Sequence, residues 1–263
     1  MILAIDIGNT HTVIGIYNGK KLLGDWRVTS FVTRTEDEVG MLIKQFCDEA
    51  KVPFKKIESI GISSVVPNLT DVCVRMARKY FMIEPVVVSA ALDLGITILY
   101  DDPMSVGADR LCNAVAGFLK YRGPLVIVDF GTATTFDVVS KNGEYLGGVI
   151  TAGIETSAGE LHRRAAKLPK IDLKFPDKVI GTNTVASMQA GILYSALDSM
   201  ETMIRRISKE LDDYPTVIAT GGYSEMMKKY SKVIEKHEPT LVLDGIRFIV
   251  ERMEKRTKKS AKK

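Results

Sequence analysis

The sequence is poor in the residues that build metal clusters and disulfide frameworks. Its 263 residues include three cysteines, Cys47, Cys73 and Cys112, which lie far apart and form no Cys-x-x-Cys pair. Only three histidines are present, and there is no His-Glu-x-x-His motif. These absences argue against a zinc site and a disulfide scaffold. We expect the cysteines to be buried free thiols in a reducing compartment.

Two further absences narrow the class of protein. No apolar run reaches the length of a membrane span, and no basic region precedes the apolar start of the chain. We therefore expect a cytoplasmic protein with no membrane partner. The sequence also lacks a Gly-x-x-x-x-Gly-Lys-Ser/Thr loop and a Gly-x-Gly-x-x-Gly motif after a strand. P-loop and dinucleotide-binding folds lose their main support.

The net charge of +4 comes from one end of the chain. Residues 252–263 hold seven Lys or Arg and one Glu, a net of +6, so the remainder carries 4 − 6 = −2. A charge run of this kind is usually solvated. The sequence predicts a basic, disordered tail over 252–263, and the tail alone does not indicate nucleic-acid binding.

Strand-like and helix-like segments alternate along the chain. The composition, 46% hydrophobic and 26% charged, is ordinary for a soluble globular protein. Period-2 or buried apolar runs predict strands, and 3.6-residue periodicity predicts helices that include 68–81, 109–121, 184–211 and 241–255. "TEDE" at 35–38 fits a helix capping box, and Asn18-Gly19 fits a hairpin turn. This order predicts an α/β fold with mainly parallel sheets flanked by helices.

The opening pattern of the chain returns in its second half. The matched pairs, each 123 positions apart, are Asp6 and Asp129, Gly8 and Gly131, and Thr12 and Thr135. Two strand–turn–strand units of like design indicate a duplicated fold, with lobes at 1–116 and 117–251. Chance similarity between two hairpins is the alternative.

Each unit places an aspartate where an apolar strand ends. Asp6 precedes Gly-Asn-Thr, and Gly8 lets the backbone approach a ligand because it has no Cβ. Asp6 can hold Mg²⁺, which bridges phosphate oxygens. Asp129 repeats the pattern ahead of Gly131 and Thr132. Two such turns facing each other across a cleft would grip a triphosphate, whereas a single one fits a simple strand cap.

A third segment, Gly107-Ala108-Asp109-Arg110, opens a helix between the two turns. Arginine is poorly placed there, because the helix dipole favours anions at an N-terminus. Arg110 could instead grip a carboxylate in bidentate fashion, and Asp109 could accept a proton from an attacking hydroxyl. The alternative is that Asp109 caps the helix and Arg110 pairs with it.

Four motifs together resemble the type III pantothenate kinases. They are "DIGNT" at 6–10, "GADR" at 107–110, "DFGTATTFDVV" at 129–139 and "GTNTVASMQAGI" at 181–192. The resemblance spans Met1 to about Met253. It implies two actin-like (ribonuclease H-like) lobes with an ATP cleft between them, as in the acetate kinase, sugar kinase, Hsp70 and actin superfamily. It also implies ATP-dependent phosphorylation of pantothenate, the first step toward coenzyme A.

The resemblance also implies roles for individual residues. Asp109 is the general base, Asp129 binds K⁺ or NH₄⁺, and Asp6 binds Mg²⁺ directly or through water. The ATP-binding residues are Asp6, Ile7, Gly8, Asn9, Thr10, His11, Thr12, Val13 and Thr132. The pantothenate-binding residues are Tyr100, Gly107, Ala108, Asp109, Arg110 and Thr184.

The family is dimeric, with its pantothenate pocket at the subunit interface, so Thr184 is expected from the partner chain. His11 departs from the asparagine that many relatives carry and is a tolerated turn residue. Two other functions stay open at this point. One is another small-molecule kinase of the same fold, and the other is a non-enzymatic accessory factor in transcription.

Overall fold

A computed structural model describes residues 1–211 and 213–260, and within them the chain forms two compact units. The first unit contains Met1–Lys120 together with helix α7 (Leu241–Ser260), and the second contains the chain from Tyr121 to Thr240. The first boundary lies four residues beyond the predicted one. The second differs more, because residues 241–251 were predicted in the second lobe and belong to the first unit.

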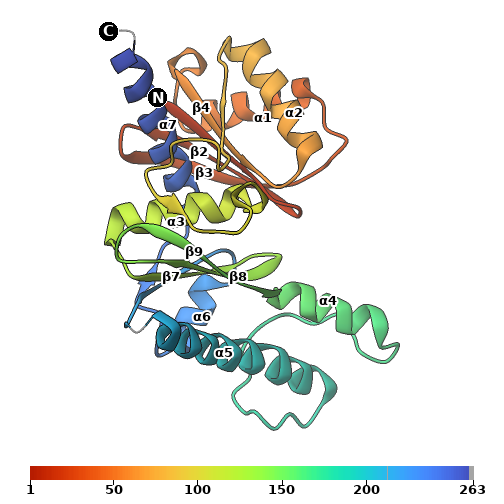
Figure 1. Ribbon diagram of the computed structural model, residues 1–263. Helices are drawn as coiled ribbons and strands as arrows, with labels where there is room; N and C mark the ends of the chain where they lie inside the picture. The colour runs from red at the N-terminus through yellow and green to blue at the C-terminus, as the bar shows by residue number, and fades with distance from the viewer. Residues whose placement is uncertain (212, 261–263) are drawn as a thin grey trace. The chain divides into compact units, whose positions relative to one another are not determined.

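The first unit is built on a mixed sheet with strand order β3-β2-β1-β4-β5 (Figure 1). The strands are β1 (Ile2–Ile7), β2 (His11–Asn18), β3 (Lys21–Thr29), β4 (Ser59–Ser64) and β5 (Val86–Val87). The hairpin strands β1, β2 and β3 pair antiparallel, whereas β4 pairs parallel with β1. At the predicted hairpin turn, Gly19 adopts a left-handed φ of +56°, which glycine tolerates best.

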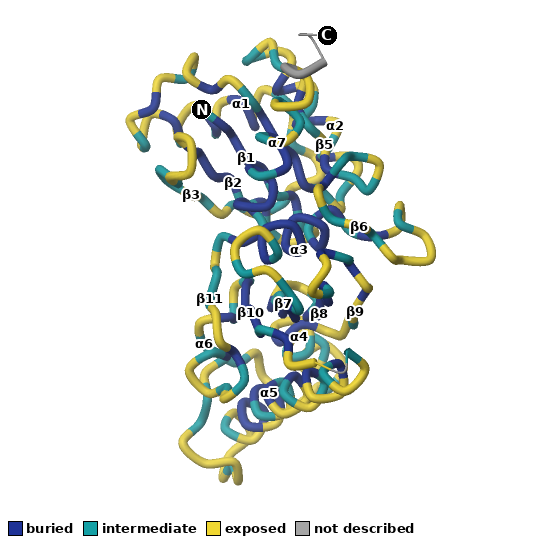
Figure 2. Tube along the Cα trace, turned by 60° about the vertical axis from the view of Figure 1, so that its left-hand side comes forward, coloured by how far each residue is buried: buried dark blue, intermediate teal, exposed yellow. Residues whose placement is uncertain are grey.

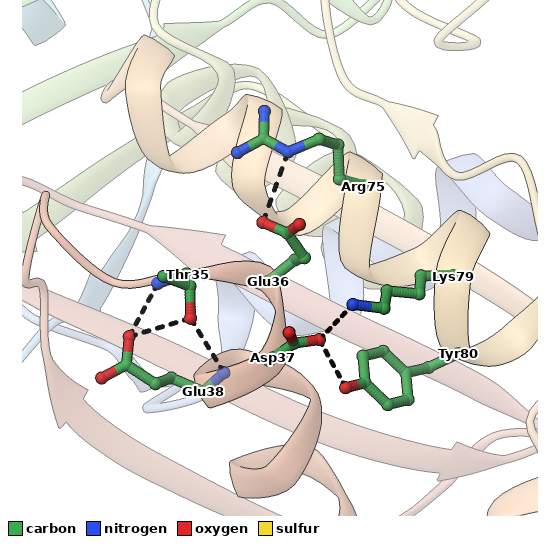
Figure 3. Close-up of polar contacts among 7 residues, drawn as sticks. All are labelled: Thr35, Glu36, Asp37, Glu38, Arg75, Lys79 and Tyr80. Carbon is green, nitrogen blue, oxygen red and sulfur yellow. Dashed lines mark hydrogen bonds and ion pairs between the residues drawn. The ribbon is translucent and has the colours of Figure 1, made fainter.

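Helices α1 (Glu36–Glu49) and α2 (Pro67–Met76) form the core of this unit with one face of the sheet. The predicted capping box is confirmed: the Glu38 backbone N–H donates to Thr35 Oγ1 (3.4 Å), and the Thr35 N–H donates to Glu38 Oε2 (2.7 Å). Figure 3 shows that Asp37 of α1 accepts hydrogen bonds from Lys79 Nζ and Tyr80 Oη, both at 2.6 Å. Both donors lie in η2 (Ala77–Phe81), the helical segment that follows α2. Pro67 begins α2, where its missing N–H costs nothing.

Helix α7 packs on the opposite face of the same sheet through glycines. A Cβ at Gly61 of β4 would lie 2.4 Å from Ile246 Cγ2, and a Cβ at Gly245 would lie 2.1 Å from the Cys112 carbonyl oxygen. The buried Asp244 carboxylate accepts from Tyr17 Oη (3.0 Å) of β2. Such close contact explains why α7 belongs to the first unit, although it is distant from that unit in sequence.

The C-terminal segment differs from its prediction as a disordered tail. Helix α7 continues to Ser260, and residues 261–263 lie outside the described residues. Asp93 accepts from Arg252 Nη2 (2.8 Å) and Arg256 Nη1 (2.6 Å), and these contacts lower the pKa of Asp93. The paired arginines favour helix where charge density alone predicted disorder. Along the described residues, no helix combines the length and apolar character needed to cross a bilayer.

The second unit repeats the design of the first. Its sheet runs β11-β10-β7-β8-β9, with antiparallel hairpin strands and parallel pairing of β7 with β10. The strands are β7 (Leu125–Phe130), β8 (Ala133–Val139), β9 (Glu144–Ala152), β10 (Thr216–Thr220) and β11 (Lys236–His237). The helices are α4 (Ile154–Arg164), α5 (Thr184–Leu211) and α6 (Ser224–Tyr230). The long helix α5 begins and ends where the sequence predicted.

Burial follows the apolar pattern of each element (Figure 2). In α5, Leu193, Leu197 and Met200 recur at helical spacing and pack in one core with Val126 and Val128 of β7. All three cysteines are buried free thiols, as predicted.

The remaining elements are η1 (Phe54–Lys56), η2 (Ala77–Phe81), β6 (Thr97–Ile98), η3 (Pro103–Ser105) and α3 (Ala108–Tyr121). The α/β fold with two helix-flanked sheets is confirmed.

Candidate active site

The first bend, Gly8-Asn9-Thr10, joins β1 to β2 in the first unit. The Gly8 N–H donates to the His11 carbonyl oxygen (3.0 Å), which closes the turn. Ser30 Oγ donates to the Gly8 carbonyl oxygen (2.7 Å), and the Ser30 N–H donates to that of Thr10 (3.0 Å). Asn9 and Thr10 are exposed at the tip. The bend is therefore a braced loop that presents its tip to solvent.

Asp6 lies at the end of β1, directly opposite Ser63 of the parallel strand β4. Ser63 Oγ donates to Asp6 Oδ1 at 2.8 Å, and Ser63 is fully buried. The sequence analysis missed Ser63. The available signal was weak: a serine near the end of an apolar run that pairs in parallel with β1.

Helix α3 begins at the predicted segment. Gly107 supplies the first carbonyl acceptor, from the Leu111 N–H (3.1 Å), and the Arg110 N–H donates to Asp109 Oδ1 (2.8 Å). A Cβ at Gly107 would lie 2.5 Å from that same oxygen. Burial raises the pKa of Asp109, and the Arg110 N–H and guanidinium oppose this rise only partly. A carboxylate with a raised pKa suits general-base work better than an ordinary one.

Cys112 lies one turn beyond Asp109 on α3 and is fully buried. Burial and the charges of Asp6 and Asp109 together raise the pKa of Cys112 well above its usual range. The structure therefore brings Asp6, Ser63, Cys112 and Asp109 into one region of the first unit, although they come from three separate elements.

The second bend, Gly131-Thr132, joins β7 to β8 in the second unit. The Thr132 carbonyl oxygen accepts from the Gly153 N–H (3.1 Å) and from Thr156 Oγ1 (2.6 Å) of α4. Asp129 lies at the end of β7, as Asp6 lies at the end of β1. Gly221 has a left-handed φ of +88°, and a Cβ there would lie 2.4 Å from Asp129 Oδ1. The backbone after β10 therefore passes directly against this carboxylate.

Comparison with known proteins identifies the family. The model of the type III pantothenate kinase family matches residues 2–206. A type III pantothenate kinase of Geobacter sulfurreducens is 48% identical over 252 residues, which is 96% of this chain and 99% of that protein. One from Bacillus cytotoxicus is 46% identical over 96% of each chain.

The chain belongs to the type III pantothenate kinase family. The resemblance of its four motifs to that family is thereby confirmed.

Solved structures agree on the fold of this type III pantothenate kinase family member. A Campylobacter jejuni protein described as a Baf family transcriptional activator matches with a TM-score of 0.60 at 17% identity, covering 96% of this chain and 99% of that one. Component A of (R)-2-hydroxyglutaryl-CoA dehydratase from Acidaminococcus fermentans matches with a TM-score of 0.55 at 13% identity, covering 95% of each chain. At such low identity the likeness shows only that the fold is shared.

The paired strands correct one detail of the repeat. Ile7 pairs with Thr12 across the first bend, and Phe130 pairs with Thr134 across the second. Thr134, not Thr135, is thus the structural counterpart of Thr12. The comparison of the two sequence repeats missed this because the second bend is one residue shorter than the first. The next hairpin turn is longer in the second repeat, so the overall spacing of the two repeats hardly changes.

The donor set around Asp6 fits a nucleotide-bound magnesium ion. Among the described residues, no group of three or more acidic, histidine or cysteine side chains is placed to hold a metal. A magnesium ion that binds together with a nucleotide does not need three protein ligands, because Mg²⁺ keeps several waters and binds one or two carboxylates plus phosphate oxygens. Asp6, half-buried beside an exposed loop tip, matches that requirement.

The remaining predicted residues lie in both units. Tyr100, in the first, is partly exposed, Arg110 is buried, and Ala108 is buried at the start of α3. Thr184, in the second, is the exposed first residue of α5. In the strands that flank the first bend, Ile7 is buried, whereas His11 and Val13 are half-buried. Tyr100 and the Gly107–Arg110 segment belong to the first unit, and Thr184 belongs to the second.

Proposed function

We propose that this protein transfers the γ-phosphoryl group of ATP to the primary hydroxyl of pantothenate, giving 4′-phosphopantothenate, the first step of coenzyme A biosynthesis. Family membership over nearly the whole chain supports the substrate pair. The observation that supports the chemistry is that the Asp6 carboxylate, held by Ser63, and the Asp109 carboxylate both raise the pKa of the same buried thiol, Cys112, in the first unit.

In this proposal each of the two bends contacts the phosphates of the nucleotide. Residues Gly8 to Thr12 contact the phosphates from one side, and Thr132 contacts them from the other. Mg²⁺, when bound, neutralises charge on the phosphate oxygens. Asp6 holds that ion directly or through water. Phosphoryl transfer of this kind is catalysed mainly by positioning and by electrostatic stabilisation.

Asp109 accepts the proton of the attacking alcohol. A carboxylate is a weak base for an alcohol, but a loose transition state needs little early deprotonation, so a weak base suffices. Arg110 binds the pantothenate carboxylate, and Tyr100 lines the same pocket. Asp109 sits on the first turn of α3, whose start at Gly107 fixes the carboxylate close to the backbone.

Three finer assignments belong to the same proposal. Asp129 binds a monovalent cation, K⁺ or NH₄⁺, beside the backbone of Gly221. Two copies of the chain assemble into a dimer, and Thr184 of one copy completes the pantothenate pocket of the other. The protein works in the cytoplasm, where pantothenate and ATP are available.

A coupled assay with pantothenate, ATP, Mg²⁺ and K⁺ tests the proposal. We expect ADP release that depends on pantothenate, and a phosphorylated product with the mass of 4′-phosphopantothenate. An acceptor panel that includes sugars and acetate serves as the control. Turnover with a sugar but not with pantothenate would assign the protein to another kinase of the fold. No turnover with any acceptor would favour a non-enzymatic role.

A further inference from the structure

Ser63 occupies a position that no motif of the sequence marked. It lies in β4 and is fully buried. Its Oγ donates to Asp6 Oδ1 at 2.8 Å. A buried hydroxyl that donates to a carboxylate fixes the orientation of that carboxylate.

The second unit has a hydroxyl at the matching place. In the parallel pairing of β1 with β4, Asp6 stands opposite Ser63, and in that of β7 with β10, Asp129 stands opposite Thr220. Both hydroxyl residues are buried, Ser63 completely and Thr220 to 2% exposure. The fold thus sets a buried hydroxyl residue opposite each bend carboxylate, on the adjacent parallel strand.

We propose that Ser63 is a positioning residue that fixes the Asp6 carboxylate in place before the magnesium nucleotide binds. The proposal rests on the proposed function insofar as it takes Asp6 as the ligand of Mg²⁺. Preorganisation of this kind lowers the cost of ordering the site when the ligand arrives. Ser63 contacts neither reacting atom and acts only through Asp6.

Serine neighbours in β4 offer a matched comparison. Ser64 follows Ser63 in the same strand, but its Oγ donates to the Val66 carbonyl oxygen (3.3 Å) and accepts from the Val66 N–H (3.0 Å). The substitutions Ser63→Ala and Ser64→Ala therefore remove the same atom from adjacent residues, and only the first removes a contact to Asp6. Ser63→Thr keeps the hydroxyl and tests rescue.

The test is calorimetric binding of ADP with and without Mg²⁺, together with the Mg²⁺ dependence of turnover. For Ser63→Ala we expect Mg²⁺ half-saturation to rise about 10-fold, as is typical when a group that orients a metal ligand is lost. The affinity for ADP in EDTA should stay within about 2-fold of the wild type. Ser64→Ala should leave both quantities within about 2-fold, and Ser63→Thr should restore most of the Mg²⁺ response.

Equal Mg²⁺ half-saturation in Ser63→Ala and Ser64→Ala would overturn the proposal. If Ser63→Ala fails to fold, Ser63→Cys carries the test, because a thiol is a weaker donor of similar shape. We then expect a rise of about 3-fold in Mg²⁺ half-saturation, and no rise would count against the proposal. Failure of the proposed function is distinguishable. In that case the wild type would not phosphorylate pantothenate, whereas Mg²⁺-dependent binding of ADP would still separate the two serine variants.

Discussion

The two bends share a plan but differ in how they are braced. In each, the residue after the third hairpin strand donates its N–H to the bend: Ser30 to Thr10, and Gly153 to Thr132. Ser30 adds a side-chain hydrogen bond to Gly8. Gly153 has no room for a side chain, since a Cβ there would lie 2.3 Å from the Gly131 carbonyl oxygen.

The difference comes from the segment that the chain enters after each hairpin. After Gly153 the chain enters α4 at once, so the helix start itself packs on the second bend and Thr156 donates to Thr132. After Ser30 the chain continues through a loop to the capping box of α1. Both units thus keep the backbone hydrogen bond from the residue after the third strand to the bend, but they differ in the side chain of that residue. The first bend is held by the Ser30 hydroxyl, and the second by packed backbone at Gly153 together with the Thr156 hydroxyl.

The largest expected effect concerns the base beside the first bend. Asp109→Ala should retain ATP binding, because both bends are intact, and should lose about 10²- to 10⁴-fold in turnover, the usual contribution of general base catalysis. Steady-state rates and ADP calorimetry on the same preparation check this. Near-normal turnover would refute the base assignment.

A large effect is also expected from the brace of the second bend. Gly153→Ala forces a Cβ against backbone atoms of Gly131 and Thr132, so the bend must shift. We expect a loss of about 2 kcal/mol in the free energy of unfolding and weaker ATP binding. Ser30→Ala, the matched change at the first bend, removes one hydrogen bond and should cost about 1 kcal/mol. Denaturant unfolding of both variants measures the difference, and a more stable Gly153→Ala would contradict this view of the bends.

The role of Asp129 at the second bend predicts a dependence on the cation. Turnover should be faster in K⁺ or NH₄⁺ than in Na⁺, because the larger and more weakly hydrated ions suit a site of this kind. Asp129→Asn should reduce this preference, whereas Ser30→Ala, at the other bend, should leave it unchanged. Initial rates at fixed ionic strength check it. Equal rates in all three salts would remove the role given to Asp129.

The smallest expected effect is on the pH dependence of stability. Burial raises the pKa of Asp109 in the folded state, so the folded protein holds this proton more tightly than the unfolded chain does. The contribution of Asp109 to stability is therefore greatest at low pH and is lost as the pH rises through its pKa in the folded protein. Asp109→Asn should stabilise the protein at neutral pH but not at acid pH. Melting temperatures across the range measure this, and the opposite sign would mean that its pKa is lowered.

Sequence reasoning succeeded where the information is local. The capping box at Thr35, the start of α2 one residue before the predicted 68, and the full extent of α5 depend on neighbours a few residues away. The bends were found because each places an aspartate at the end of an apolar strand. The start of α3 was found because it places an arginine in the first turn of a helix, where the helix dipole favours anions. Such conflicts often mark functional sites.

The features that the sequence could not supply depend on long-range packing. Helix α7 packs in the first unit because Gly61 of β4 leaves room for the Ile246 side chain, and Gly245 of α7 leaves room for the backbone of Cys112. The same contacts, with the Asp93 pairs, explain the helix where a tail was predicted. Ser63 was missed because its contact with Asp6 depends on the pairing of β4 with β1. Thr134 was missed because the shorter second bend and the longer turn after it nearly cancel in the spacing of the two repeats.

The central claim is that both bends hold one nucleotide. A crystal structure with a non-hydrolysable ATP analogue, Mg²⁺ and pantothenate tests it most directly. We predict phosphate oxygens within hydrogen-bond distance of the backbone of Gly8–Thr12 and of Thr132, with the pantothenate hydroxyl beside Asp109. A nucleotide whose phosphates contact only one of the two bends would contradict the claim.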